Sequence, residues 1–76
     1  MLVKTEEMAV AGRSIQVRFF ESRLPNGHRR YSAELVLGPG DSVILDDDSM
    51  PSLEVRARRL VPATVYSRTL AGHPAA

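Results

Sequence analysis

Apolar and polar side chains alternate along two neighbouring stretches of the chain, residues 14–22 and 29–37. A period of two is typical of strands with one buried and one exposed face, so both stretches predict half-buried antiparallel strands. A three-residue turn at residues 25–27 would place Phe19 opposite Ala33 and keep the apolar side chains on one face, whereas a two-residue turn would mix the faces. The Pro-Asn-Gly sequence of this turn also suits a type I turn followed by a G1 bulge. The sequence therefore predicts a hairpin in this register.

The same pattern predicts one strand before this hairpin and one after it. Residues 4–11 form the first strand if Gly12 and Arg13 make a type II′ turn, because that turn favours glycine at its first central position. Residues 42–46 form the last strand, after a five-residue connection with a type II turn at residues 38–41. The inner face would then carry two apolar rows: Val10, Ile15, Leu37, Val43 and Met8, Val17, Leu35, Leu45. The outer face would carry one charged row: Glu7, Arg18, Glu34 and Asp46.

The C-terminal third of the chain predicts a helix that covers the apolar face of this sheet. Polar residues just before Pro51 can cap the helix, and apolar residues recur behind it at helical spacing. Pro62 lacks a backbone N–H and its ring clashes with the carbonyl four residues earlier, so we expect the helix to be kinked or split there. Residues 62–71 would form a weaker second segment that ends at Gly72. The predicted fold class is α+β, a four-stranded antiparallel meander with one covered face, in the order ββββα(α).

The predicted core combines one face of the strands with one stripe of the helix. A chain of 76 residues has room for one domain, which we place at residues 1–76 with residues 72–76 as a flexible tail. Because such a core is small, we expect Leu60→Ala to cost roughly 2 to 4 kcal/mol. The predicted core residues are Val10, Ile15, Val17, Phe19, Leu35, Leu37, Val43, Leu45, Leu53, Ala57 and Leu60.

Composition and charge exclude several classes of function. The chain has no cysteine, which excludes disulfides, thiolate nucleophiles and cysteine-based zinc sites. Its apolar runs are too short to span a bilayer and its N-terminal stretch is charged, so we expect a cytoplasmic protein without a membrane segment. A net charge of +1 predicts neither a polyanion nor a polycation as the partner.

No motif in the sequence predicts catalysis. The acidic run at residues 46–48 lacks the glycine and glutamate of an EF-hand loop, since Pro51 and Ala57 stand at those positions. We interpret the run as the cap of the helix, with a loose divalent-cation site as the alternative. His28 and His73 have no nearby nucleophile or paired carboxylate in the sequence. The sequence therefore predicts a protein that is not an enzyme and binds no cofactor or metal.

Two functions remain open. The first is a protein-interaction or regulatory module that acts as a homodimer, because a small core and open sheet edges favour association. The segment after Pro62 would dock on the second subunit or another protein, although it could instead fold back on its own sheet. Its contact residues would be Val65, Tyr66 and Leu70. The alternative is a weak nucleic-acid-binding protein that uses two arginine clusters. These comprise Arg23, Arg29, Arg30, Arg56, Arg58 and Arg59.

Overall fold

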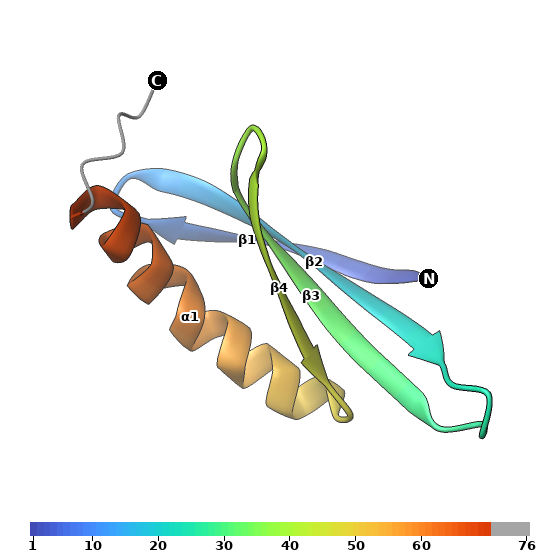
Figure 1. The fold of residues 1–76 in the computed structure, drawn as a ribbon. Coiled ribbons are helices and arrows are strands. Elements are labelled where there is room, and N and C mark those ends of the chain that lie inside the picture. The colour runs from blue at the N-terminus through green and yellow to red at the C-terminus, as the bar shows by residue number, and fades with distance from the viewer. Residues whose placement is uncertain (71–76) are drawn as a thin grey trace.

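Four strands and one helix account for most of residues 1–70, the part of the chain that this computed structural model describes. The strands lie side by side in the sequence order β1-β2-β3-β4, each antiparallel to the next, and the helix α1 covers one face of the sheet (Figure 1). This confirms the predicted α+β class in the order ββββα. Residues 72–76, predicted as a tail, lie outside the described residues. The elements are β1 (Leu2–Val10), β2 (Arg13–Arg23), β3 (Arg29–Gly38), β4 (Asp41–Asp47) and α1 (Met50–Leu70).

The middle hairpin has the predicted register. Phe19 lies opposite Ala33, so the apolar side chains of β2 and β3 share one face. In the turn, the Gly27 N–H donates to the Leu24 carbonyl at 2.9 Å, and the Leu24 N–H donates to the His28 carbonyl at 2.8 Å. Gly27 has a φ of 88°, the left-handed conformation that a G1 bulge requires. The predicted three-residue turn is therefore confirmed.

The predicted register of the first hairpin is wrong by two residues. Val10 lies opposite Arg13, which makes Ala11 and Gly12 the central residues of the turn. Both have positive φ, 51° and 77°, as a type I′ turn demands. Sequence reasoning misplaced this turn because an alanine rarely adopts the left-handed conformation. Met8 consequently lies opposite Ile15 rather than opposite Val17.

The predicted register of the last hairpin is also wrong by two residues. Gly38 lies opposite Asp41, so the turn closes directly on the strands instead of lying within a longer connection. Gly40 has a φ of 70°, which a type II turn requires at its third residue. An irregularity between Val36 and Gly38 then shifts the pairing, and Val43 lies opposite Leu35.

These shifts change the predicted charged row on the outer face. Thr5 and Ile44 occupy its two ends, in place of Glu7 and Asp46. Arg18 and Glu34 remain neighbours in the middle, with 3.5 Å between a guanidinium nitrogen and a carboxylate oxygen. The row therefore holds one ion pair, flanked by uncharged residues.

The helix α1 runs without a break through Pro62, so the predicted split at this residue does not occur. Pro62 lies on the exposed side of α1. Its neighbours Val61 and Val65 are buried against the sheet and extend the stripe that begins at Leu53. Burial of these side chains stabilises the helix on both sides of the proline and offsets the hydrogen bond that Pro62 cannot donate.

The core lies between the middle of the sheet and α1. Ala33, Val61 and Val65 belong to it although they were not predicted. Four predicted core residues are only partly buried, because α1 lies over the middle of the sheet and covers the edge strands incompletely. These four are Val10, Val43, Leu45 and Leu60. The buried core comprises Ile15, Val17, Phe19, Ala33, Leu35, Leu37, Leu53, Ala57, Val61 and Val65.

Candidate interaction surface along β4

The two edges of the sheet differ, and β1 has features that block pairing. Lys4 and Glu6 point toward the covered face, where Lys4 Nζ lies 2.9 Å from Glu6 Oε1 and 2.7 Å from Glu54 Oε2 of α1. Hydrogen bonds to Glu54 and then Glu6 raise the pKa of Lys4. A bulge also interrupts β1 between Leu2 and Lys4. Inward charges and bulges are devices that protect an edge strand from further pairing.

The edge formed by β4 has no such protection in its middle. Residues 42–45 are Ser-Val-Ile-Leu, without a charge or a proline. No strand lies on the outer side of β4 within residues 1–70. Ile44 points away from α1 and is 58% exposed. The middle of β4 therefore presents an uncharged edge on which an extended chain could pair.

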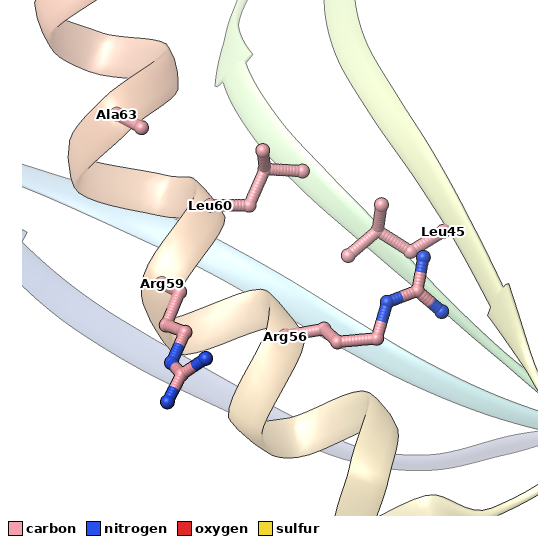
Figure 2. A pocket seen from close by; sticks show the side chains of 5 residues that line it. All are labelled: Leu45, Arg56, Arg59, Leu60 and Ala63. Carbon is pink, nitrogen blue, oxygen red and sulfur yellow. The ribbon is translucent and has the colours of Figure 1, made fainter.

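A groove lies beside this edge, between β4 and α1. We call it the β4 groove; its volume is about 280 Å³. Leu60 points from α1 toward the strands, and Arg56 extends toward Leu45, whereas the guanidinium of Arg59 points away from β4 (Figure 2). Leu45 and Leu60 are only partly buried, so the groove exposes apolar surface next to the open edge. The groove is lined by Leu45, Arg56, Arg59, Leu60 and Ala63.

The acidic residues at both ends of β4 are bound to arginines of α1. Arg68 donates two hydrogen bonds to Asp41, from Nε and from Nη2, each at 3.0 Å. At the other end, Arg56 Nη1 donates to Asp47 Oδ2 at 3.1 Å. Arg56 Nη1 also donates to the Asp46 carbonyl at 2.7 Å. On the helix side, the two ends of β4 therefore carry neutralised carboxylates, Asp41 and Asp47, whereas the Asp46 side chain lies exposed on the outer face.

Of the residues predicted to cap the helix, Ser49 does so, because its Oγ accepts the Ser52 N–H at 3.4 Å, while Asp47 supports the start of α1 through other bonds. Asp47 accepts hydrogen bonds from the Ser49 N–H at 3.0 Å and from the Ser52 hydroxyl at 2.9 Å. The bond from Ser52, followed by that from Arg56, lowers the pKa of Asp47 from 3.8 to about 2. Among residues 1–70, no three histidine, aspartate or glutamate side chains group together as metal ligands would.

Of the three residues predicted to contact a partner, one is buried and two are exposed. Val65 is buried in the core of its own chain and cannot reach another molecule. The segment after Pro62 thus packs on its own sheet, the alternative that the sequence had left open. Tyr66 and Leu70 are 65% and 69% exposed and remain accessible.

The six arginines of the nucleic-acid alternative lie on three elements, β2, β3 and α1, and carboxylates already neutralise half of them. Arg29 pairs with Glu21 at 3.4 Å, and Arg58 pairs with Glu54 at 3.4 Å. Arg56 pairs with Asp47, as described above. The hairpin that carries the first cluster extends beyond the start of α1, which carries the second (Figure 1). Within residues 1–70, no ion pair involves Arg23, Arg30 or Arg59.

Sequence reasoning missed the β4 groove, and the one signal along this strand concerns its outer face. Val43, Ile44 and Leu45 are consecutive apolar residues in a strand, so both faces of β4 carry apolar side chains. A strand buried on one face normally alternates apolar with polar residues. An apolar residue on the outer face of an edge strand is therefore a sign of a further contact.

Comparisons with protein-family models, curated proteins and solved structures find no match for this chain. No helix in the described part of the chain has the length and apolar character needed to cross a membrane.

Proposed function

We propose that this protein is a non-catalytic protein-interaction module that acts as a homodimer through the open edge of β4. The observation that carries the proposal is the difference between the two edges. Lys4, Glu6 and a bulge block β1, while the middle of β4 has no charge and lies beside an apolar groove. The absence of cysteine is consistent with a reducing compartment, and we place the protein in the cytoplasm.

The energetics of a small domain support association. One core in a chain of this length supplies only a few kcal/mol of net stability. Leu45 and Leu60 leave apolar surface in water beside β4, and covering such surface contributes about 25 cal/mol per Å². The main-chain groups that the middle of β4 presents at the sheet edge would also gain partners in a second strand. Association through β4 therefore adds both apolar burial and hydrogen bonds.

The test is the mass of the full-length protein in solution, measured by sedimentation equilibrium over a range of concentrations. We expect a dimer at micromolar concentration. Ile44→Lys should shift the equilibrium toward monomer, because it places a charge on the open edge. Thr5→Lys is the matched control, since Thr5 is exposed at the other end of the same cross-strand row and should leave the dimer intact.

Circular dichroism shows whether both variants keep the native fold. A wild-type protein that stays monomeric at high micromolar concentration would overturn the proposal. So would a dimer that Ile44→Lys and Thr5→Lys weaken equally, because the two edges would then not differ.

Nucleic-acid binding is an alternative outcome that the same sample can reveal. The neutralisation of Arg29, Arg56 and Arg58 argues against a continuous basic surface. We therefore expect no binding of a fluorescent oligonucleotide at physiological salt. Binding that weakens steeply with salt, in a protein that is otherwise monomeric, would replace the homodimer with the nucleic-acid function.

A further inference from the structure

We infer that the second copy pairs antiparallel with β4 about a two-fold axis that passes through Ile44. The two four-stranded sheets then form one continuous sheet, with both helices on the same face. This inference rests on the proposed homodimer and specifies its geometry. It predicts which residue of β4 meets its own copy.

The length of β4 places the axis. In a two-fold interface, if one residue of the first copy lies opposite a second residue of the other copy, the reverse contact is also made. Two antiparallel β4 strands related in this way therefore have one residue that lies opposite itself, at the axis. The strand β4 spans seven residues, Asp41–Asp47, and Ile44 is the middle one. An axis at Ile44 therefore pairs every residue of the strand, whereas an axis at Val43 or Leu45 leaves residues at one end unpaired.

The side chains of the covered face favour the same axis. With the axis at Ile44, Val43 lies opposite Leu45 of the second copy, and both are partly buried apolar residues. Moving the axis to Leu45 would bring Val43 opposite Asp47, and moving it to Val43 would bring Leu45 opposite Asp41. Pairs of apolar residues stabilise a sheet, and the shifted registers lose these pairs.

The charges at the strand ends fit a second copy of this chain. The axis at Ile44 brings Asp41 opposite Asp47 of the second copy, and two carboxylates in that position would normally repel each other. Here each carboxylate already carries an arginine, since Arg68 binds Asp41 and Arg56 binds Asp47. On the helix side, each end of the paired strands thus holds two carboxylates and two guanidinium groups, so the charges balance there, while the carboxylate of Asp46 lies on the opposite face.

The β4 groove gains a cover in this arrangement. Both grooves lie on the helix side of the joined sheet, so they face each other across the axis. Leu60 and Ala63 line the groove from α1, and Leu45 lines it from β4 (Figure 2). The partly buried Leu45 would lie beside Val43 of the second copy and lose its remaining contact with water. Pairing about an axis at Ile44 would thus use three features of the surface: the open edge, the groove beside it and the exposed Ile44.

Disulfide trapping tests the geometry, because the chain has no cysteine of its own. Ile44 is exposed, so Ile44→Cys should fold normally. At the axis the new side chain faces its own copy across about 4.5–5.5 Å between Cβ atoms, close to the separation that a disulfide needs. We expect mild oxidation with copper phenanthroline to convert most of this variant to a species of twice the mass on a non-reducing denaturing gel.

Matched variants report on the register and on the other surfaces. Ser42→Cys and Asp46→Cys should each remain uncrosslinked alone but should crosslink when mixed, because the axis places residue 42 opposite residue 46. Thr5→Cys on the blocked edge and Tyr66→Cys on α1 should remain monomeric on the same gel.

The outcomes separate the two proposals. Crosslinking of Ser42→Cys alone, in a protein that is a dimer by mass, overturns this geometry and leaves the β4 interface standing, because the axis would lie elsewhere on β4. A dimer that crosslinks through Thr5→Cys or Tyr66→Cys, and through no cysteine of β4, overturns both this geometry and the proposed β4 interface. A wild-type protein that is monomeric overturns both.

Discussion

Leu53 shows how strongly single residues determine the stability of this protein. It is fully buried, two positions before Val55, which is 48% exposed on the other side of α1. The buried stripe continues at every fourth residue, through Ala57 and Val61. Leu60, which the sequence assigned to the core, lies at the side of this stripe and lines the β4 groove instead. Leu53 should therefore contribute more than Leu60 to the free energy of unfolding of the single chain.

Leu53→Ala should lower the free energy of unfolding by about 3 kcal/mol, because it leaves a cavity under the helix. Leu60→Ala should cost less in the monomer, since the side chain is only partly buried. Val55→Ala is the control on the same helix and should change the stability by no more than about 0.5 kcal/mol. Urea denaturation, followed by circular dichroism at low protein concentration, measures all three. Equal losses for Leu53→Ala and Leu60→Ala would contradict the observed position of the stripe.

At the scale of elements, α1 is attached to β4 near both of its ends. Asp47 accepts hydrogen bonds from Ser52 and Arg56 in the first turns of α1, and Asp41 binds Arg68 in the last. These bonds orient the helix along the edge strand. They also make the attachment depend on the ionisation of carboxylates.

Stability should fall as the pH is lowered from about 4 to about 2, in part through Asp47. Its pKa is about 2 in the folded protein, against an ordinary value of 3.8. The ionised group therefore stabilises the folded state above its ordinary pKa, and this contribution is lost as the pH falls through the folded value. Urea denaturation midpoints over this range measure the effect.

Asp47→Asn should reduce this pH dependence, because it removes the ionising group. Asp46→Asn is the matched control, since the exposed Asp46 side chain lies on the outer face of the same strand. A pH profile that Asp47→Asn leaves unchanged would show that other carboxylates account for the acid sensitivity.

Elements were easier to predict from the sequence than their registers. The middle hairpin was correct because the alternation of its strands and its Pro-Asn-Gly turn independently indicate the same pairing. The outer hairpins depend on a left-handed alanine at position 11 and on an irregularity between Val36 and Gly38, which no simple pattern reveals. The β4 groove was out of reach for the same reason, because it depends on the position of α1 relative to an edge strand whose register was misassigned.

At the scale of the whole molecule, the helix covers the sheet unevenly. The middle strands β2 and β3 contribute all the buried residues of the sheet, while the apolar residues of β4 are only partly buried. A second copy placed against β4 would complete this coverage. The free energy of unfolding would then include a contribution from the contact between the two copies.

The melting temperature should rise with protein concentration, because a dimer is favoured over unfolded monomers by mass action. Ile44→Lys should remove most of this dependence, since it disfavours pairing through β4 without touching the buried core. Differential scanning calorimetry over a wide concentration range measures both proteins. A wild-type melting temperature that is independent of concentration would argue that the folded state is a monomer.

The ion cluster on β1 would also limit the size of the proposed assembly. A sheet with two receptive edges would add copies at both ends and grow into a fibre, as cross-β polymers do. In the proposed dimer, each β4 is consumed at the centre and each β1 becomes an outer rim. There Lys4 and Glu6 point inward beside a bulge, so a third copy finds no regular strand to extend. In the proposed dimer, the contact between Lys4 and Glu54, which holds the inward charge in place, would thus end the growth of the sheet at two copies.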